Sequence, residues 1–357
     1  DLINNPNPKE SLRFLKDVIG SGAWIGNSYL KYLTSLAGFN KKVYGNINDH
    51  DGQYIIDKVQ KNIKIDSTEY SPQQIFNAIY RELDYTHHNP KYITKLKCPK
   101  IFPTIVLISG VFNELYKTAA FERGVQHLAK TSGLKYFVAD THGFKCTDHN
   151  TNQIEEQLFE YSKNHPDEKL WIVAYSKGGV DVLHFLKKNS EWSKANMAGL
   201  STIATPILGS QHLNHNFFKF INTINSISEK SALKFIRKNK DVLAKDLRES
   251  LDQKNQKPWF RNNYHLLPNN MFYTSLALEA EWYESHVYMM LAKIFFPSDS
   301  VNDGIVDTES ALFPDYFNAL NLGIIKGHHL IGARSSTYSQ EALITAHVIF
   351  LKYLNYI

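Results

Sequence analysis

The chain has 357 residues, of which 43% are hydrophobic and 21% charged, so it can bury one large core and is not intrinsically disordered. Its net charge of +5 is small for this length, and Lys and Arg are interspersed with Asp and Glu without a basic tract. This pattern excludes the usual signature of a nucleic-acid-binding protein, and we expect no nucleic-acid partner. No apolar run reaches the roughly 18 residues that a transmembrane helix needs.

The two cysteines, Cys98 and Cys146, are too few for a disulfide scaffold, and neither belongs to a metal-type pair. One disulfide and two buried thiols are both compatible with them. The chain begins at Asp1 rather than at Met, so a signal peptide or another upstream segment can have been removed. The compartment is left open, with a secreted or cell-envelope location favoured.

The first part of the chain, residues 1–97, is polar and has helical spacing of its apolar residues. Within it, Ser71 followed by Pro72 is the typical beginning of a helix, because Ser caps the free N–H groups and Pro fits the first helical position. We therefore expect residues 1–97 to form an N-terminal helical extension.

From Lys100 onward, short apolar β-branched runs alternate with helical patterns. We expect strands at residues 104–110, 135–140, 170–176 and 199–206, and helices at 115–131, 151–163 and 178–188. Such alternation predicts an α/β fold with a doubly wound, mostly parallel sheet covered by helices on both faces.

The alternation stops at residues 207–285, which we expect to form a helical lid inserted into the sheet domain. Apolar residues at helical spacing and many lysines give this segment amphipathic character. Two interpretations remain open: contact with an acyl chain and an anionic lipid surface, or helices packed on their own domain with solvated lysines. The sheet pattern resumes at 288–296 and 322–327, and a helix ends the chain. We therefore expect the sheet domain to comprise residues 98–206 and 286–357.

Ser176 lies between a predicted strand and a predicted helix, in the stretch Ala174-Tyr175-Ser176-Lys177-Gly178. A sharp strand-to-helix turn exposes the Oγ of its middle residue and requires small residues two positions before and after it. Gly178 meets this requirement, and Ala174 departs from glycine by one methyl group. The pattern favours a nucleophilic serine, whereas the alternative is an ordinary helix N-cap.

A nucleophilic serine needs a histidine base that a carboxylate orients, in the chain order Ser, acid, His. Asp303 follows one predicted strand, and the pair His328 and His329 follows the next. Because the carboxyl ends of parallel strands lie at one edge of a sheet, these side chains can meet Ser176. Asp299 and Asp307 are rival acids at this stage.

An oxyanion hole needs two backbone N–H donors. Lys177, directly after the serine, supplies one, and the loop after the first strand of the sheet supplies the other. Gly110 lets that loop approach closely, so Val111 is our candidate donor and Phe112 its rival. An ordinary glycine turn is the alternative interpretation.

These motifs together resemble the α/β-hydrolase superfamily and, within it, lipase-like serine esterases. The resemblance covers about residues 100–357, and it rests on LISGVFN, AYSKGGVD, IATPILGS, NDGIVDTESA and GHHL. It implies that Asp303 is the acid and, because the family's histidine is often followed by leucine, that His329 is the base. Two residues depart from the pattern: Ser109 stands where a His-Gly pair is usual, and Ala174 replaces glycine.

The function expected from these residues is that of a serine carboxylic-ester hydrolase acting on lipid or acyl-ester substrates. The expected catalytic residues are Ser176, Asp303 and His329, with Val111 and Lys177 as oxyanion donors. No metal or organic cofactor is expected. An acyltransferase with the same residues, or a non-catalytic binding protein on the same scaffold, are the alternatives.

Overall fold

The computed structural model describes residues 50–111, 118–210, 249–281, 301–333 and 338–357. The helices are α3 (His50–Gln60), α4 (Pro72–His88), α5 (Glu122–Ser132), α6 (Thr147–Asn164), α7 (Lys177–Lys188), α8 (Ser190–Asn196), α12 (Gln253–Asn263) and α14 (Gln340–Tyr353), with two 3-10 turns, η4 (Tyr264–Leu266) and η6 (Glu309–Ala311). The strands are β1 (Thr104–Ile108), β2 (Tyr136–Ala139), β3 (Leu170–Tyr175), β4 (Met197–Ile203), β5 (Phe272–Glu279) and β6 (Leu320–Lys326).

The six strands form one sheet in the order β2-β1-β3-β4-β5-β6, and every pairing is parallel. The predicted fold class is therefore confirmed. Because β3 lies in the middle of the sheet, its carboxyl end is flanked on both sides by other strand ends. This position suits a functional residue at the end of β3.

The prediction for residues 207–285 needs one correction, because β5 lies inside this segment. Residues Gly199 to Ile203 of β4 pair with Phe272 to Leu276 of β5, so the sheet resumes at Phe272 and not after residue 285. The strand predicted at 288–296 lies outside the described residues. Residues 211–248 and 282–285 of the predicted lid lie outside them as well.

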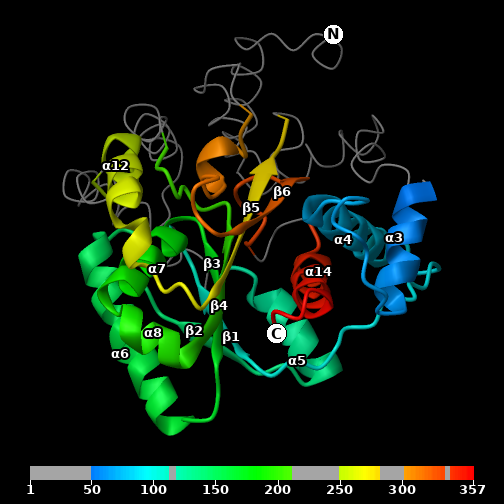
Figure 1. Cartoon of the computed structure of the whole chain (residues 1–357), viewed down its shortest axis with the longest axis horizontal. Coiled ribbons are helices and arrows are strands. Elements are labelled where there is room, and N and C mark those ends of the chain that lie inside the picture. The colour runs from blue at the N-terminus through cyan, green and yellow to red at the C-terminus, as the bar shows by residue number, and fades with distance from the viewer. Residues whose placement is uncertain (1–49, 112–117, 211–248, 282–300, 334–337) are drawn as a thin grey trace, which may run out of the picture.

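Helices cover both faces of the sheet (Figure 1), with α6, α7 and α8 on one side and α4, α5 and α14 on the other. The side chains of β3 alternate between these two layers. Trp171, Val173 and Tyr175 belong to the core beneath α14, whereas Ile172 and Ala174 belong to the core beneath α7. The last residue of β3, Tyr175, therefore faces the α14 side.

The described part of the N-terminal segment packs on this sheet. Helix α4 begins as predicted: the Ser71 side chain accepts a hydrogen bond from the Gln74 N–H, and Pro72 is the first helical residue. Phe76 of α4 contacts Phe350 of α14 edge to face, with 5.6 Å between the ring centroids. Helices α3 and α4 thus extend the core on the α14 side.

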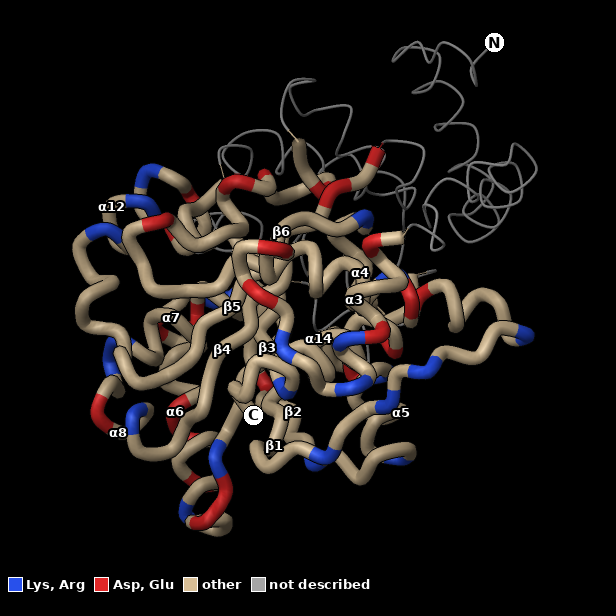
Figure 2. Tube along the Cα trace, turned by 45° about the vertical axis from the view of Figure 1, so that its right-hand side comes forward, with Lys and Arg blue, Asp and Glu red and all other residues tan. Residues whose placement is uncertain are grey.

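Charged residues of both signs are interspersed along the described chain (Figure 2). Cys98 and Cys146 are both free thiols. Among the described helices, none has the length and apolar composition that a bilayer crossing needs.

Candidate active site

Ser176 occupies a sharp turn between β3 and α7. Its φ of 54° and ψ of −133° lie in a region that residues with a side chain rarely adopt. The turn is held by a hydrogen bond from the Ser176 N–H to the Ile203 carbonyl of β4, 3.1 Å long. This backbone conformation lifts the side chain out of the strand, as the small residues on either side of it predict.

The elbow requires glycine at position 178. A Cβ at Gly178 would lie 2.8 Å from the Ile108 carbonyl oxygen and against the Ser109 carbonyl. Ala174, by contrast, is fully buried beneath α7 with its methyl group in place. Helix α7 can therefore pass close to β1 only with glycine at 178, while the other small position accepts alanine.

The structure brings Ser176, His329 and Asp303 together, although 153 residues separate the serine from the histidine. Ser176 Oγ lies 2.8 Å from His329 Nε2, and His329 Nδ1 lies 2.6 Å from Asp303 Oδ2. All three side chains are buried, with exposed fractions of 6%, 5% and 1% respectively. With Nδ1 donating to the carboxylate, Nε2 is left to accept the serine hydroxyl proton.

Asp303 is held by its own loop. Its Oδ1 accepts hydrogen bonds from the Ile305 and Val306 N–H groups, at 2.9 and 2.8 Å. Its carbonyl accepts a hydrogen bond from the His329 N–H at 2.8 Å. The Asn-Asp-Gly turn thus fixes the carboxylate and directs its second oxygen toward the imidazole.

The rival residues have other surroundings. His328 is buried beside His329, but its Nδ1 accepts a hydrogen bond from the Leu330 N–H at 3.1 Å, and its ring meets Tyr338 edge to face. Asp307 accepts hydrogen bonds from Ser310 and Ala311 at its backbone carbonyl, at the beginning of η6. Asp299 and Phe112 lie outside the described residues.

Gly110 brings the end of β1 against the elbow. A Cβ on Gly110 would lie 2.7 Å from Ser176 Cβ and 2.9 Å from Lys177 N. Val111, the proposed second oxyanion donor, follows Gly110 directly in the chain. Ser109, which departs from the family pattern, accepts a hydrogen bond at its Oγ from the Ala120 N–H at 2.8 Å. Its side chain therefore ties the end of β1 to residue 120.

The Lys177 side chain is fully buried beneath the elbow, which the sequence did not predict. Its Nζ lies 2.8 Å from both carboxylate oxygens of Asp181, one turn further along α7. Asn150 of α6 also donates to this carboxylate, at 2.7 Å. Burial raises the pKa of Asp181, and the Lys177 ammonium opposes that rise. The pair joins the first turn of α7 to α6.

Tyr175 is a second residue near the site that the sequence did not identify. Its ring stacks on the His329 ring, with 5.4 Å between the centroids and 26° between the planes. Tyr175 directly precedes the nucleophile, and the alternation of side chains along β3 directs its ring to the α14 side. The contact itself depends on the path of a loop about 150 residues away.

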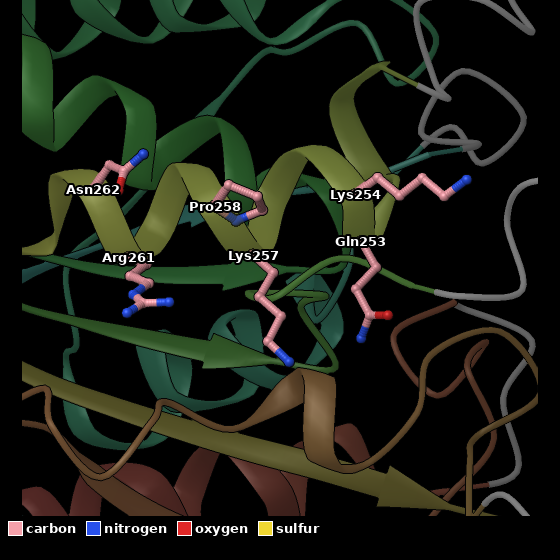
Figure 3. A pocket seen from close by; sticks show the side chains of 6 residues that line it. All are labelled: Gln253, Lys254, Lys257, Pro258, Arg261 and Asn262. Atoms are coloured by element: carbon pink, nitrogen blue, oxygen red, sulfur yellow. The ribbon is translucent and has the colours of Figure 1, made fainter.

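A separate cavity of about 640 Å³ lies along α12 and is lined by none of the triad residues. It is lined by Gln253, Lys254, Lys257, Pro258, Arg261 and Asn262. Figure 3 shows Lys257 and Arg261 projecting from the same side of α12. No group of three or more His, Cys, Asp or Glu in the described residues could hold a metal ion.

Solved structures similar to this one include two ester hydrolases. The metagenomic carboxyl esterase MGS0156 matches with a TM-score of 0.56 and 21% sequence identity, over 73% of this chain and 79% of that one. The mature lipase BlEst2 of Bacillus licheniformis matches with a TM-score of 0.50 and 20% identity, over 72% of this chain and 93% of that one. No protein-family model and no curated protein matches the sequence. The parallel sheet, the elbow at the end of β3 and the likeness to these two structures together show that the chain has the α/β-hydrolase fold.

Proposed function

We propose that the protein is a serine carboxylic-ester hydrolase that works through an acyl-enzyme intermediate. The observation that carries this proposal is the continuous chain of short contacts from Ser176 Oγ to His329 and from His329 to Asp303. A serine hydroxyl is a weak nucleophile until a neighbouring base accepts its proton, and this arrangement supplies that base.

In the proposed reaction, Ser176 Oγ attacks the ester carbonyl carbon while its proton moves to His329 Nε2. The carbonyl oxygen becomes an oxyanion, for which the Lys177 and Val111 N–H groups are the proposed donors. His329 then gives its proton to the departing alcohol as the carbon–oxygen bond breaks. A water molecule then attacks the acyl carbon while one of its protons moves to His329. The bond between the acyl carbon and Ser176 Oγ breaks, His329 returns the proton to Ser176 Oγ, and the carboxylic acid leaves.

Asp303 keeps the His329 imidazole in the tautomer that can accept a proton at Nε2. It also compensates the positive charge that the imidazole then carries. The hydrogen bonds from Ile305 and Val306 hold this carboxylate in place before the reaction begins. Preorganised groups of this kind cost no rearrangement in the transition state.

The esterase and lipase neighbours support an acyl-ester or lipid substrate for this chain. We further propose that the part of segment 207–285 that carries α12, outside β5, contacts an anionic lipid surface. Lys254, Lys257 and Arg261 support this, because all three are exposed and recur at helical spacing on α12 (Figure 3). Co-sedimentation with neutral and with phosphatidylserine-containing vesicles tests it: binding should need the anionic lipid and should fall in a triple Glu variant. Equal binding to both vesicles would contradict it.

Hydrolysis of p-nitrophenyl esters with short and long acyl chains tests the proposed activity. Ser176→Ala and His329→Ala should each lower kcat by about 10⁴- to 10⁶-fold. Ser67→Ala and His265→Ala are matched controls, because both residues are exposed, and they should keep wild-type turnover. Full activity in Ser176→Ala would refute the mechanism. Failure of the folded wild type to hydrolyse any ester would favour the non-catalytic binding protein.

The acyltransferase alternative shares the first half of this reaction and differs in the acceptor. Product analysis in water and with added alcohols distinguishes the two. A hydrolase releases mainly the free acid, whereas an acyltransferase forms mainly the new ester at alcohol concentrations far below that of water.

A further inference from the structure

We propose that Tyr175 is a positioning residue for His329: its ring supports one face of the imidazole and stabilises the imidazolium formed when Ser176 loses its proton. The inference rests on the proposed hydrolase function and adds a fourth side chain to its machinery. Tyr175 does not touch the reacting atoms. It acts through the base.

The contact is a stacked one between two buried rings. The centroids of Tyr175 and His329 are 5.4 Å apart, and the ring planes meet at 26°. The exposed fractions of the two residues are 8% and 5%. A cation within about 6 Å of an aromatic ring face is attracted by the negative charge of that face, and the attraction grows when water is excluded.

Tyr175 and Ser176 are consecutive residues, and the strand geometry gives them different tasks. Tyr175 is the last residue of β3 and points to the α14 side, whereas the elbow turns Ser176 out of the sheet. The loop that carries His329 crosses this same side, with Ile331 buried in the same core. The end of β3 therefore positions both the nucleophile, Ser176, and the Tyr175 ring on which the His329 imidazole stacks.

Phe121 packs against the tyrosine ring. The two rings meet edge to face, with 5.3 Å between the centroids and 84° between the planes. The Phe121 N–H also donates to the Gly332 carbonyl at 3.1 Å, three residues after His329. Phe121 therefore contacts both the Tyr175 ring and the loop that carries His329. This link favours the stacked arrangement of the two rings.

The stacking matters because the edges of the imidazole are already occupied. Ser176 lies at Nε2 and Asp303 at Nδ1, so the ring face is where further stabilisation of a positive charge can act. Within the part of the chain that the structure describes, the titratable groups that meet the His329 ring are Asp303 and Tyr175. The adjacent His328 is engaged with the Leu330 N–H and the Tyr338 ring. An aliphatic side chain at 175 would offer the imidazolium no such attraction.

The pH dependence of ester hydrolysis tests this role. In Tyr175→Leu, the midpoint of the acidic limb of kcat/KM should move down by about 0.3 to 1.5 pH units, because the protonated base loses stabilisation. The kcat should fall about 2- to 30-fold with KM within about twofold of wild type. Tyr175→Phe keeps the ring face and should keep the wild-type limb. Phe350→Leu removes a buried ring of the same core that packs on Phe76 of α4, and it should leave the limb in place.

A second measurement does not need activity. In the Ser176→Ala background, NMR of ¹³C-labelled histidine should show the His329 ring titrating at lower pH when Tyr175 is replaced by Leu, or by Met if the Leu variant does not fold. An unchanged titration would overturn the inference even if the protein hydrolyses esters. If the titration shifts but the wild-type protein hydrolyses no ester, the effect of Tyr175 on His329 is supported and the proposed function is refuted. A Tyr175→Phe variant that behaves like Tyr175→Leu would also overturn it.

Discussion

Asp303 and His329 are joined twice, once through their side chains and once through their backbones. The carboxylate Oδ2 lies 2.6 Å from the imidazole Nδ1, and the Asp303 carbonyl accepts the His329 N–H at 2.8 Å. The acid therefore fixes both the ring and the loop that carries it. A substitution that keeps the shape but removes the charge tests the first of these two links.

Asp303→Asn should lower kcat by about 10⁴-fold, because an amide can stabilise neither the required tautomer nor the imidazolium. The backbone link and the bulk of the side chain are retained, so the fold should persist. Asp307→Asn, four residues away, is the control and should lose far less activity. Steady-state kinetics with a soluble ester measure both variants. If Asp307→Asn lost more kcat than Asp303→Asn, Asp303 would not be the catalytic acid.

The buried pair of Lys177 and Asp181 should be costly to break on one side only. Asp181→Asn leaves the lysine charge without its counter-ion and should destabilise the fold by about 3–5 kcal/mol. The double variant Lys177→Met with Asp181→Leu removes both charges and should be much more stable than the single one. Urea unfolding midpoints compare the three proteins. If the double variant is as unstable as the single one, burial of an unpaired charge is not the cause.

Gly178→Ala should impair both folding and turnover. Its Cβ would lie 2.8 Å from the Ile108 carbonyl oxygen, so α7 and Ser176 must shift away from β1. A shift of that kind misplaces the nucleophile, and kcat should fall about 100-fold. Gly133→Ala is the control, because a Cβ at Gly133 meets no atom within 4 Å. It should cost only about 1 kcal/mol, from its left-handed backbone, and leave kcat unchanged. If the two variants had equal kcat, the close approach of α7 to β1 at Gly178 would not be needed to position Ser176.

Stability should fall in mild acid because of His347. Burial lowers the pKa of His347 in α14 from 6.5 to about 4, and its Nε2 is buried without a hydrogen-bond partner among the described residues. Between these two pH values, His347 is therefore protonated in the unfolded chain and neutral in the folded chain. The contribution of neutral His347 to the free energy of unfolding is fully present above about pH 6.5. It is lost as the pH falls toward 4 and amounts to at most about 3 kcal/mol.

Unfolding midpoints in urea between pH 4 and 7 measure this dependence. His347→Leu should flatten the part of the curve that His347 causes, while the exposed His265→Gln should keep the wild-type slope. An unchanged slope in His347→Leu would show that other groups dominate the acid response. His184, whose pKa burial also lowers to about 4, is then the next residue to replace.

Strands with apolar β-branched residues were predictable from the sequence, whereas β5 was not. The β5 sequence FYTSLALE contains Thr274 and Ser275, which are fully buried yet read as polar. Each has a side-chain partner: Thr274 Oγ1 donates to Ser201 Oγ at 2.8 Å, and Ser275 Oγ lies 2.5 Å from Asn321 Oδ1. These hydrogen bonds make polar side chains acceptable in the core, and hydrophobicity alone does not reveal them.

The order of Ser176, Asp303 and His329 along the chain was also predictable, because each follows a strand or strand-like run and parallel strands end at one edge. The ring contact of Tyr175 and the complete burial of the Lys177 side chain were not predictable. The four-residue spacing of Lys177 and Asp181 on a helix permits their pairing, but ring stacking and burial depend on how the elements pack. Local spacing thus predicts which strand ends carry the chemistry, and packing decides which neighbours support it.

Labelling with a fluorophosphonate, followed by mass spectrometry of the digested protein, tests the central claim most directly. The probe reacts with a serine only when a base activates it and donors accept the oxyanion. We predict one adduct per chain, located on Ser176, and its loss in both Ser176→Ala and His329→Ala. A folded wild-type protein that takes up no probe, or takes it up at another serine, would contradict the account.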